Sequence, residues 1–357
     1  MRVISVSVFG VLAACLCTSV VAQDVDHPPH YFFELSDFEL ELGETLTDAR
    51  VLYVTHGTLN AERSNAVLLP SFYQGRHHGY DNLIGRDAAL DPNEYFVIVT
   101  EFFGSGGSSS PSNLPAGASH DDFPRVTIRD NVRAQHRLVT ERFQIDHLRA
   151  VIGVSMGAQQ AFQWAVSYPD FMDLIVPWTG TAKAYSHGVV RMESALTLIT
   201  HDPSVLAGHD TVSSAGARAW ELHWLSWRRS TEWFRLNLEL DQAGVQAFVD
   251  ESFSTESLNR PHDRVVQGRT WQLHNVGETP GFDGDVERAL ASIKALVLYM
   301  PTATDMYFPI TDAEYERQFI PNVDFRPIPS IWGHLAPGTD EERAFLMGAI
   351  REALEGA

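Results

Sequence analysis

Short runs of apolar residues alternate with amphipathic stretches through the first half of this chain. Residues 95–100 are β-branched or aromatic without apolar–polar alternation, which is typical of a strand buried on both faces. The runs at 148–152 and 174–178 have the same character, and helical patterns separate the three runs. We therefore predict an α/β fold with a mostly parallel sheet flanked by helices, extending from about residue 67 to residue 178.

Two shorter apolar runs precede this region. Residues 51–54 and 67–69 are separated by the polar, turn-rich segment 57–65. This spacing predicts an early hairpin or a pair of edge strands.

Later patterns complete the predicted core. The capping-box pattern at 127–130 predicts a helix that continues to about Phe143. Apolar runs at 295–300 and 323–328 predict that the sheet resumes near the C-terminus, and an amphipathic helix at 340–354 closes the chain.

The pattern changes between about residues 181 and 285, where helical stretches rich in tryptophan replace the strand-like runs. We interpret this segment as a helical cap inserted into a core formed by residues 23–180 and 286–357. Three tryptophans are spaced as neighbours on one helix face: Trp220, Trp224 and Trp227. We interpret most of the tryptophans as packed core, and the lining of an apolar acyl pocket is the alternative.

The chain is strongly acidic. It contains 46 Asp and Glu against 26 Lys and Arg, so its formal net charge is −20. Such a surface repels nucleic acids and anionic membranes, which argues against a function in nucleic-acid binding.

The N-terminus has the features of an export signal. Arg2 provides a positive charge, an apolar run follows, and Ala22 ends a small-residue cleavage site. We expect residues 1–22 to be removed as a signal peptide and the mature protein to be secreted or periplasmic. A membrane anchor and a lipoprotein signal with lipid on Cys15 are the alternatives. Because Cys15 and Cys17 are the only cysteines, the mature chain would have no disulfide and no cysteine nucleophile.

The most informative motif is Gly153-Val154-Ser155-Met156-Gly157, which lies between an apolar run and a helical pattern. In so tight a strand–turn–helix connection, a side chain at Gly153 or Gly157 would crowd the neighbouring strand or helix. The turn would lift the Ser155 hydroxyl above the sheet edge, beside the first free amides of the helix. These amides would begin an oxyanion hole, and Ser155 is the predicted nucleophile.

A nucleophilic serine needs a base, and the base needs an orienting carboxylate. In this type of fold the acid and the histidine follow the serine along the chain, each on a loop after a strand. Asp305 and His334 have these positions. A turn or helix cap at Asp305 and a surface turn at His334 are the alternatives, but their joint placement favours a Ser155–Asp305–His334 triad. The second oxyanion amide is expected around residues 72–74.

The sequence predicts no cofactor and no metal. No H-E-x-x-H motif is present, and residues 283–287 resemble only the start of a calcium loop. The Gly/Ser-rich stretch 104–112 lacks the lysine and the helix start of a phosphate-binding loop. Because it follows a buried strand, we predict that it forms one wall of a pocket.

Several segments together resemble the homoserine O-acetyltransferase family of α/β-hydrolases, densely over about residues 50–180 and more thinly over 295–340. They are residues 57–60, 64–68, 83–85, 89–91, 123–135, 153–165, Tyr168-Pro169, 305–309 and Gly333-His334. The resemblance implies an α/β-hydrolase fold and an acyl-serine intermediate. It also implies the triad Ser155, Asp305 and His334, with oxyanion amides at Met156 and Tyr73.

The chain departs from that family at one informative position. The acetyltransferases usually carry an aspartate directly after the catalytic histidine, which holds the amine of the substrate, and this chain has Leu335 there. The oxyanion-loop segment is also replaced, by residues 71–75. In addition, an exported enzyme would rarely meet acetyl-CoA, which is a cytoplasmic metabolite.

We therefore predict an exported serine hydrolase that cleaves an ester of a small molecule, with water as the acceptor. A CoA-dependent O-acetyltransferase and a catalytically silent binding protein with the same fold are the alternatives. The expected partner is a small-molecule acyl substrate, and a homodimer is left open.

Overall fold

The computed structural model describes residues 28–238, 242–253 and 259–357. The predicted signal peptide at 1–22, together with Cys15 and Cys17, lies outside the described residues. Within these ranges no helix is both long enough and apolar enough to cross a membrane.

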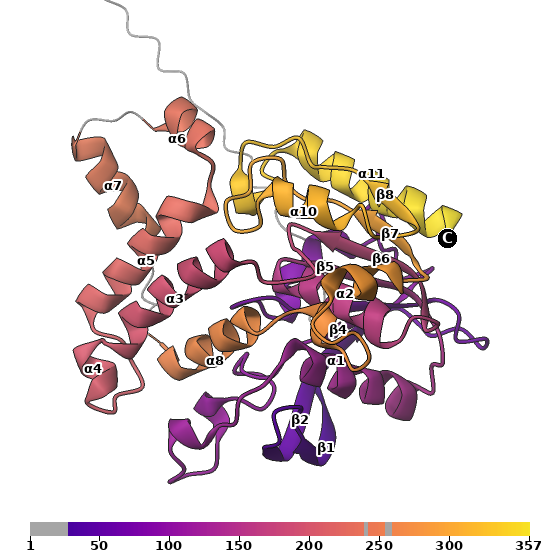
Figure 1. Ribbon diagram of the computed structural model, residues 1–357, viewed down its shortest axis with the longest axis horizontal. Helices are drawn as coiled ribbons and strands as arrows, with labels where there is room; N and C mark the ends of the chain where they lie inside the picture. The colour runs from indigo at the N-terminus through magenta and orange to yellow at the C-terminus, as the bar shows by residue number, and fades with distance from the viewer. Residues whose placement is uncertain (1–27, 239–241, 254–258) are drawn as a thin grey trace, which may run out of the picture.

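In the described part of the chain, eight strands form one sheet in the order β1-β2-β4-β3-β5-β6-β7-β8 (Figure 1). β2 is antiparallel to both β1 and β4, and the other neighbouring strands are parallel. The predicted α/β architecture with a mostly parallel sheet is therefore confirmed. The strands are β1 (Tyr31–Glu39), β2 (Thr45–His56), β3 (Ala66–Pro70), β4 (Phe96–Thr100), β5 (Leu148–Val154), β6 (Met172–Trp178), β7 (Leu296–Tyr299) and β8 (Val323–Phe325).

One prediction about the sheet is wrong. The runs at 51–54 and 67–69 lie in β2 and β3, but β4 separates these strands, so they form neither a hairpin nor a pair of edge strands. All five residues of β3 are buried, because this strand lies between β4 and β5 inside the sheet. Its uninterrupted apolar run is that of a parallel strand covered on both faces. The hairpin partner of β2 is β1, whose exposed polar positions gave no clear apolar pattern.

Helices cover both faces of the sheet. α1 (Ile128–Arg137), α2 (Met156–Ser167), α9 (Val286–Ala291) and α10 (Ile310–Glu316) contribute to one core cluster, and α11 (Asp340–Gly356) and the 3₁₀ helix η1 (His77–Leu83) to the other. The capping box of α1 is confirmed, because Thr127 Oγ1 accepts from the Asp130 amide and Asp130 Oδ2 accepts from the Thr127 amide. A π-helical turn, η4 (Leu138–Arg142), extends this helix almost to Phe143, as predicted.

The segment that we predicted as a cap, residues 181–285, is helical where it is described and contains no strand there apart from isolated bridges. Most of its helices lie beside the sheet rather than on its flanking layers (Figure 1). We refer to residues 181–285 as the cap segment. Its helices are α3 (Ser186–Thr200), α4 (Pro203–Leu206), α5 (Ser214–Arg228), α6 (Thr231–Asn237), α7 (Gln242–Ser252), α8 (Pro261–Gln272) and η6 (Val276–Glu278).

Candidate active site

Ser155 lies at the turn between β5 and α2, in a strained backbone conformation with φ 54° and ψ −120°. The glycines on both sides allow this turn. A Cβ at Gly153 would lie 2.1 Å from the Gly157 carbonyl oxygen, and a Cβ at Gly157 would lie 2.5 Å from the Tyr80 hydroxyl. The tight turn predicted from the sequence is therefore present. Met156 is the first residue of α2, where backbone amides have no carbonyl partner one turn earlier.

The three residues predicted as a triad meet in one hydrogen-bonded chain. His334 Nε2 lies 3.0 Å from Ser155 Oγ, and His334 Nδ1 lies 2.9 Å from Asp305 Oδ2. The Asp305 side chain is fully buried and that of His334 is 13% exposed. This arrangement places a potential base between a hydroxyl and a carboxylate, as nucleophilic catalysis requires.

Tyr307 and Thr304 hold this chain in place. The Tyr307 amide donates to Asp305 Oδ1 at 2.7 Å, and the Tyr307 ring stacks on the His334 imidazole with centroids 4.2 Å apart. Thr304 Oγ1 donates to the Ser330 carbonyl at 2.7 Å and accepts from the Gly333 amide at 3.3 Å. The loop after β7 is thereby tied to the loop after β8, which fixes the acid relative to the histidine.

Tyr73 lies in the loop after β3, and its side chain lines the same cavity as Ser155. Two glutamines position this loop. Gln160 on α2 donates to the Ser71 carbonyl at 2.7 Å, and Gln267 on α8 accepts from the Gln74 amide at 2.7 Å. The predicted oxyanion loop is therefore fixed from both the core and the cap segment. Sequence analysis did not single out either glutamine, because each contacts this loop only in the folded chain.

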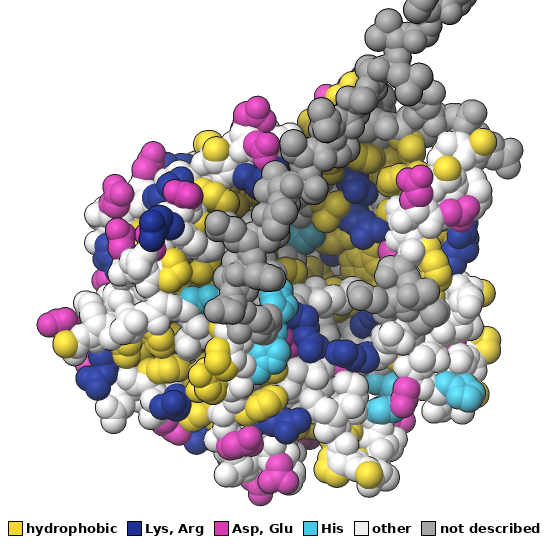
Figure 2. Space-filling view, turned by 180° about the vertical axis from the view of Figure 1, so that it is seen from behind, with side chains coloured by type: hydrophobic (Ala, Val, Ile, Leu, Met, Phe, Trp, Pro, Cys, Tyr) yellow, Lys and Arg dark blue, Asp and Glu magenta, His cyan; other side chains and the backbone are white. Residues whose placement is uncertain are grey.

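The cavity at Ser155 has a volume of about 370 Å³ and lies between the core loops and the cap segment. Aromatic residues form much of its wall, and on the face shown in Figure 2 hydrophobic and basic side chains gather around a hollow. Trp220, Trp224 and Trp271 contribute from the cap segment, and all three are buried. They are thus packed core and pocket lining at once, so the two interpretations of these tryptophans are not exclusive.

Arg191 on α3 is a residue of the cavity that sequence analysis missed. It is only 4% exposed, and its Nε and Nη1 have no hydrogen-bond partner in the described part of the protein. Its guanidinium carbon lies 4.0 Å from the centroid of the Tyr307 ring and 5.1 Å from that of Trp224. Burial lowers the pKa of Arg191, while its attraction to Tyr307 and Asp305 opposes that shift. A lone arginine in an amphipathic helix gives no sequence signal for such a position.

The Gly/Ser-rich stretch 104–112 does not line the cavity at Ser155. It folds around Glu101: Ser105 Oγ donates to Glu101 Oε2 at 3.0 Å, and Ser108 Oγ donates to the Glu101 carbonyl at 2.6 Å. Residues of this stretch line two neighbouring cavities instead. The stretch therefore forms part of a pocket wall, as predicted, but these pockets are not the cavity at Ser155.

Comparison with known proteins places this geometry in a family. A family model described as alpha/beta hydrolase fold matches residues 67–337. The chain is 37% identical to ethyl acetate hydrolase from Pseudomonas veronii over 328 residues, which cover 89% of this chain and 93% of that protein. The solved structure of the acetyl esterase MekB superposes with a TM-score of 0.83 and 35% identity, covering 92% of this chain and 97% of that one.

The resemblance to homoserine O-acetyltransferases is also confirmed. The enzyme of that name from Haemophilus influenzae is 28% identical over 358 residues, which cover 91% of this chain and 98% of that protein. Relatives of both kinds are named as enzymes, and solved structures of an acetyl esterase and of a homoserine O-acetyltransferase share the fold described above. This chain is accordingly an enzyme, and it belongs to the alpha/beta-hydrolase family.

Proposed function

We propose that this enzyme is a serine esterase that hydrolyses short-chain esters of small alcohols through an acyl-serine intermediate. The observation that carries the proposal is the chain from Ser155 Oγ through His334 to Asp305, with contacts of 3.0 and 2.9 Å, at the wall of a cavity lined by aromatic residues. The names of two relatives, an ethyl acetate hydrolase and an acetyl esterase, support an acetyl ester as the substrate.

In the first half-reaction Ser155 Oγ attacks the ester carbonyl carbon while His334 Nε2 accepts the hydroxyl proton. The Asp305 carboxylate accepts a hydrogen bond from the Nδ1–H group of His334. This bond keeps the imidazole in the required tautomer and stabilises the imidazolium that forms. Amides of Met156 and Tyr73 donate to the oxyanion of the tetrahedral intermediate. When that intermediate collapses, the alcohol leaves with the proton from His334 and the acyl group stays on Ser155.

In the second half-reaction a water molecule attacks the acyl-serine, with His334 again as the base. Leu335 supports water over an amino alcohol as the acceptor. It lines the cavity directly after His334, where the related acetyltransferases usually carry an aspartate, and its side chain has no group that could bind an amine. The aromatic walls and the small volume of the cavity favour a compact, apolar ester.

The direct test compares Ser155→Ala with Ser167→Ala, a substitution at the last residue of α2, the helix that begins directly after Ser155, and outside the proposed triad. With p-nitrophenyl acetate, we expect Ser155→Ala to lose turnover and labelling by a fluorophosphonate probe, and Ser167→Ala to retain both. Acetyl-CoA with a panel of alcohols is the parallel assay. Acyl transfer from acetyl-CoA to an alcohol, with slow ester hydrolysis, would favour the O-acetyltransferase instead. Absence of both activities and of labelling in the wild type would favour a silent binding protein.

We also propose that the enzyme acts outside the cytoplasm, on the strength of the charged, apolar and small-residue pattern of residues 1–22. Cell fractionation with N-terminal sequencing tests this. We expect a mature N-terminus at Gln23 in the periplasm or medium. An uncleaved chain in the cytoplasm would contradict the proposal.

A further inference from the structure

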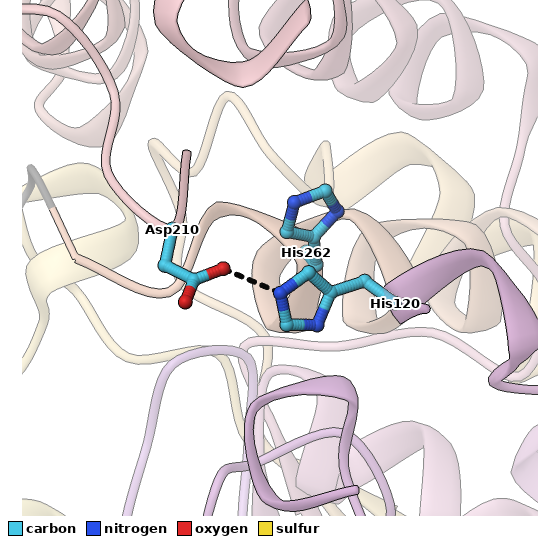
Figure 3. Close-up of side chains that lie close together, drawn as sticks. All are labelled: His120, Asp210 and His262. Carbon is cyan, nitrogen blue, oxygen red and sulfur yellow. Dashed lines mark hydrogen bonds and ion pairs between the residues drawn. The ribbon is translucent and has the colours of Figure 1, made fainter. Parts of the chain in front are cut away.

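Three potential metal ligands meet outside the Ser155 cavity. They are His120 in the 3₁₀ helix η3 (His120–Asp122), Asp210 in the loop between α4 and α5, and His262 near the start of α8. Each offers one ligand atom, and these atoms lie within 4.8 Å of one another. Figure 3 shows the carboxylate of Asp210 directed at His120, with the imidazole of His262 beside it. The two imidazoles are stacked, with centroids 4.2 Å apart.

An ordinary ion pair accounts for only part of this cluster. His120 Nε2 is hydrogen-bonded to Asp210, and its Nδ1 donates to the Pro111 carbonyl at 3.1 Å. His262 is not part of that pair, and its buried Nε2 has no hydrogen-bond partner among the described residues. A buried ring nitrogen without a partner is costly unless another group satisfies it.

The surrounding charges favour a dication. Asp210 and Asp263 line the same cavity as His262, and Asp121 directly follows His120 in the chain, while Arg260 is the cationic side chain among the residues that line this cavity. Asp263 is buried, accepts from Ser112, and offsets the charge of Arg260. The hydrogen bond from His120 Nδ1 to a backbone carbonyl is the outer contact that typically orients a metal-binding histidine.

We propose that His120, Asp210 and His262 bind a zinc-like divalent cation. Two imidazoles and one carboxylate suit Zn²⁺, which takes such ligands at about 2.0–2.2 Å and leaves a fourth position open for water. Ligand atoms around a tetrahedral ion lie roughly 3.4 Å apart at these bond lengths, so the widest separations in the cluster have to shorten while the hydrogen-bonded His120–Asp210 pair moves apart. The stacked imidazoles also have to turn so that each directs a nitrogen lone pair at the ion. The exposed Asp210 lies on a loop and supplies the movement, and the ion replaces the proton between Asp210 and His120.

The site joins two parts of the molecule. His120 belongs to the core loop after β4, whereas Asp210 and His262 belong to the cap segment. The cavity that these three residues line shares no lining residue with the cavity at Ser155. The ion therefore fastens the cap segment to the core and takes no part in the ester chemistry. Ligand binding to the folded state alone raises stability by mass action.

The experiment is a Zn²⁺ titration of the chelator-treated, otherwise intact enzyme by calorimetry, with thermal unfolding in parallel. The variants are His120→Asn and His262→Asn, and His201→Asn on the cap segment is the matched control. Esterase activity without metal verifies that each variant is folded. For the wild type and the control, we expect one tight site per chain. At Zn²⁺ about 100 times above Kd, we also expect a Tm rise of several degrees.

Both site variants should bind Zn²⁺ at least ~10-fold more weakly and lose the Tm shift, in keeping with ligand removal. Equal binding by all four proteins would assign the metal to scattered surface histidines and overturn the proposal. Absence of tight binding by the wild type would leave only the His120–Asp210 ion pair and would overturn it as well.

Discussion

The core and the cap segment contribute different things to the site at Ser155. The core supplies the proposed reacting groups, Ser155, Asp305 and His334, each on a connection after a strand of the sheet. The cap segment supplies much of the wall, through the tryptophans and Arg191. On the proposed function, the chemistry depends on connections that the sheet positions, whereas the fit of the substrate depends on helices of the cap segment that line the cavity. Substitutions in the two regions should differ accordingly.

The largest effect is expected in the core, at Asp305, the buried acid of the proposed triad. Asp305→Asn should lower kcat by about 10⁴-fold, because an amide does not hold the histidine in the tautomer that accepts the serine proton. Steady-state kinetics with p-nitrophenyl acetate measures this, and near-UV circular dichroism verifies the fold. A loss below ~10-fold would show that Asp305 is not the orienting carboxylate.

The next largest effect is expected at the junction between the two regions, in the pH dependence of the free energy of unfolding. Glu316 on α10 is fully buried, accepts from the Ala182 amide at the start of the cap segment, and accepts from the Tyr299 hydroxyl at 2.8 Å. Burial raises its pKa from the usual 4.5 to about 8, although these donors act in the opposite direction. In the folded protein Glu316 thus keeps a proton that it releases above about pH 4.5 in the unfolded chain. The free energy of unfolding should fall as pH rises from 4.5 to 8, at most by about 1.4 kcal/mol per pH unit.

Glu316→Gln should remove this contribution, because the amide stays neutral at every pH. Urea unfolding at several pH values across that window, for the wild type and the variant, measures it. A pH dependence that is identical in both proteins would mean that Glu316 is ionised in the fold.

A smaller effect is expected in the wall of the cap segment. Trp224→Ala should raise kcat/KM for p-nitrophenyl hexanoate relative to kcat/KM for p-nitrophenyl acetate by about 10-fold, because the enlarged cavity admits a longer acyl chain. The control is Trp227→Ala, since Trp227 is half-buried and does not line the cavity. If both variants change this ratio equally, Trp224 does not determine which acyl chain length the enzyme prefers.

The smallest effect is expected at Tyr73. Its proposed role belongs to the backbone amide, and its hydroxyl donates to the Arg264 carbonyl at 3.3 Å. Tyr73→Phe keeps the amide and should change kcat by less than about threefold, the scale of one neutral hydrogen bond. A loss of 100-fold or more would assign the hydroxyl itself to the reaction.

The same contrast between regions explains what the sequence could predict. The meeting of Ser155, Asp305 and His334 was predictable because the motif and the order of strands place each residue on a particular loop, whatever the details of packing. The parallel sheet was predictable from its uninterrupted apolar runs. The pairing of β2 with β1 rather than β3 was not, because strand order depends on contacts between distant segments.

Arg191, Gln267 and the cluster of His120, Asp210 and His262 were not predictable for a similar reason. Arg191 reaches the cavity because α3 packs against both α5 and α8. Gln267 contacts Gln74 and Gly104, which lie far away in the sequence. The three members of the cluster come from separate segments, so no short ligand motif marks them.

The central claim is that an acyl group resides on Ser155 and passes to water. The most direct measurement is acid quenching of the wild type and of Ser155→Ala during turnover of p-nitrophenyl acetate, followed by peptide mass mapping. We expect one acetyl group on the wild-type peptide that contains Ser155, and no adduct in the variant. The acetyl group should be released as free acetate at the rate of turnover. An acetyl group on another residue, or turnover that persists in Ser155→Ala, would contradict the claim.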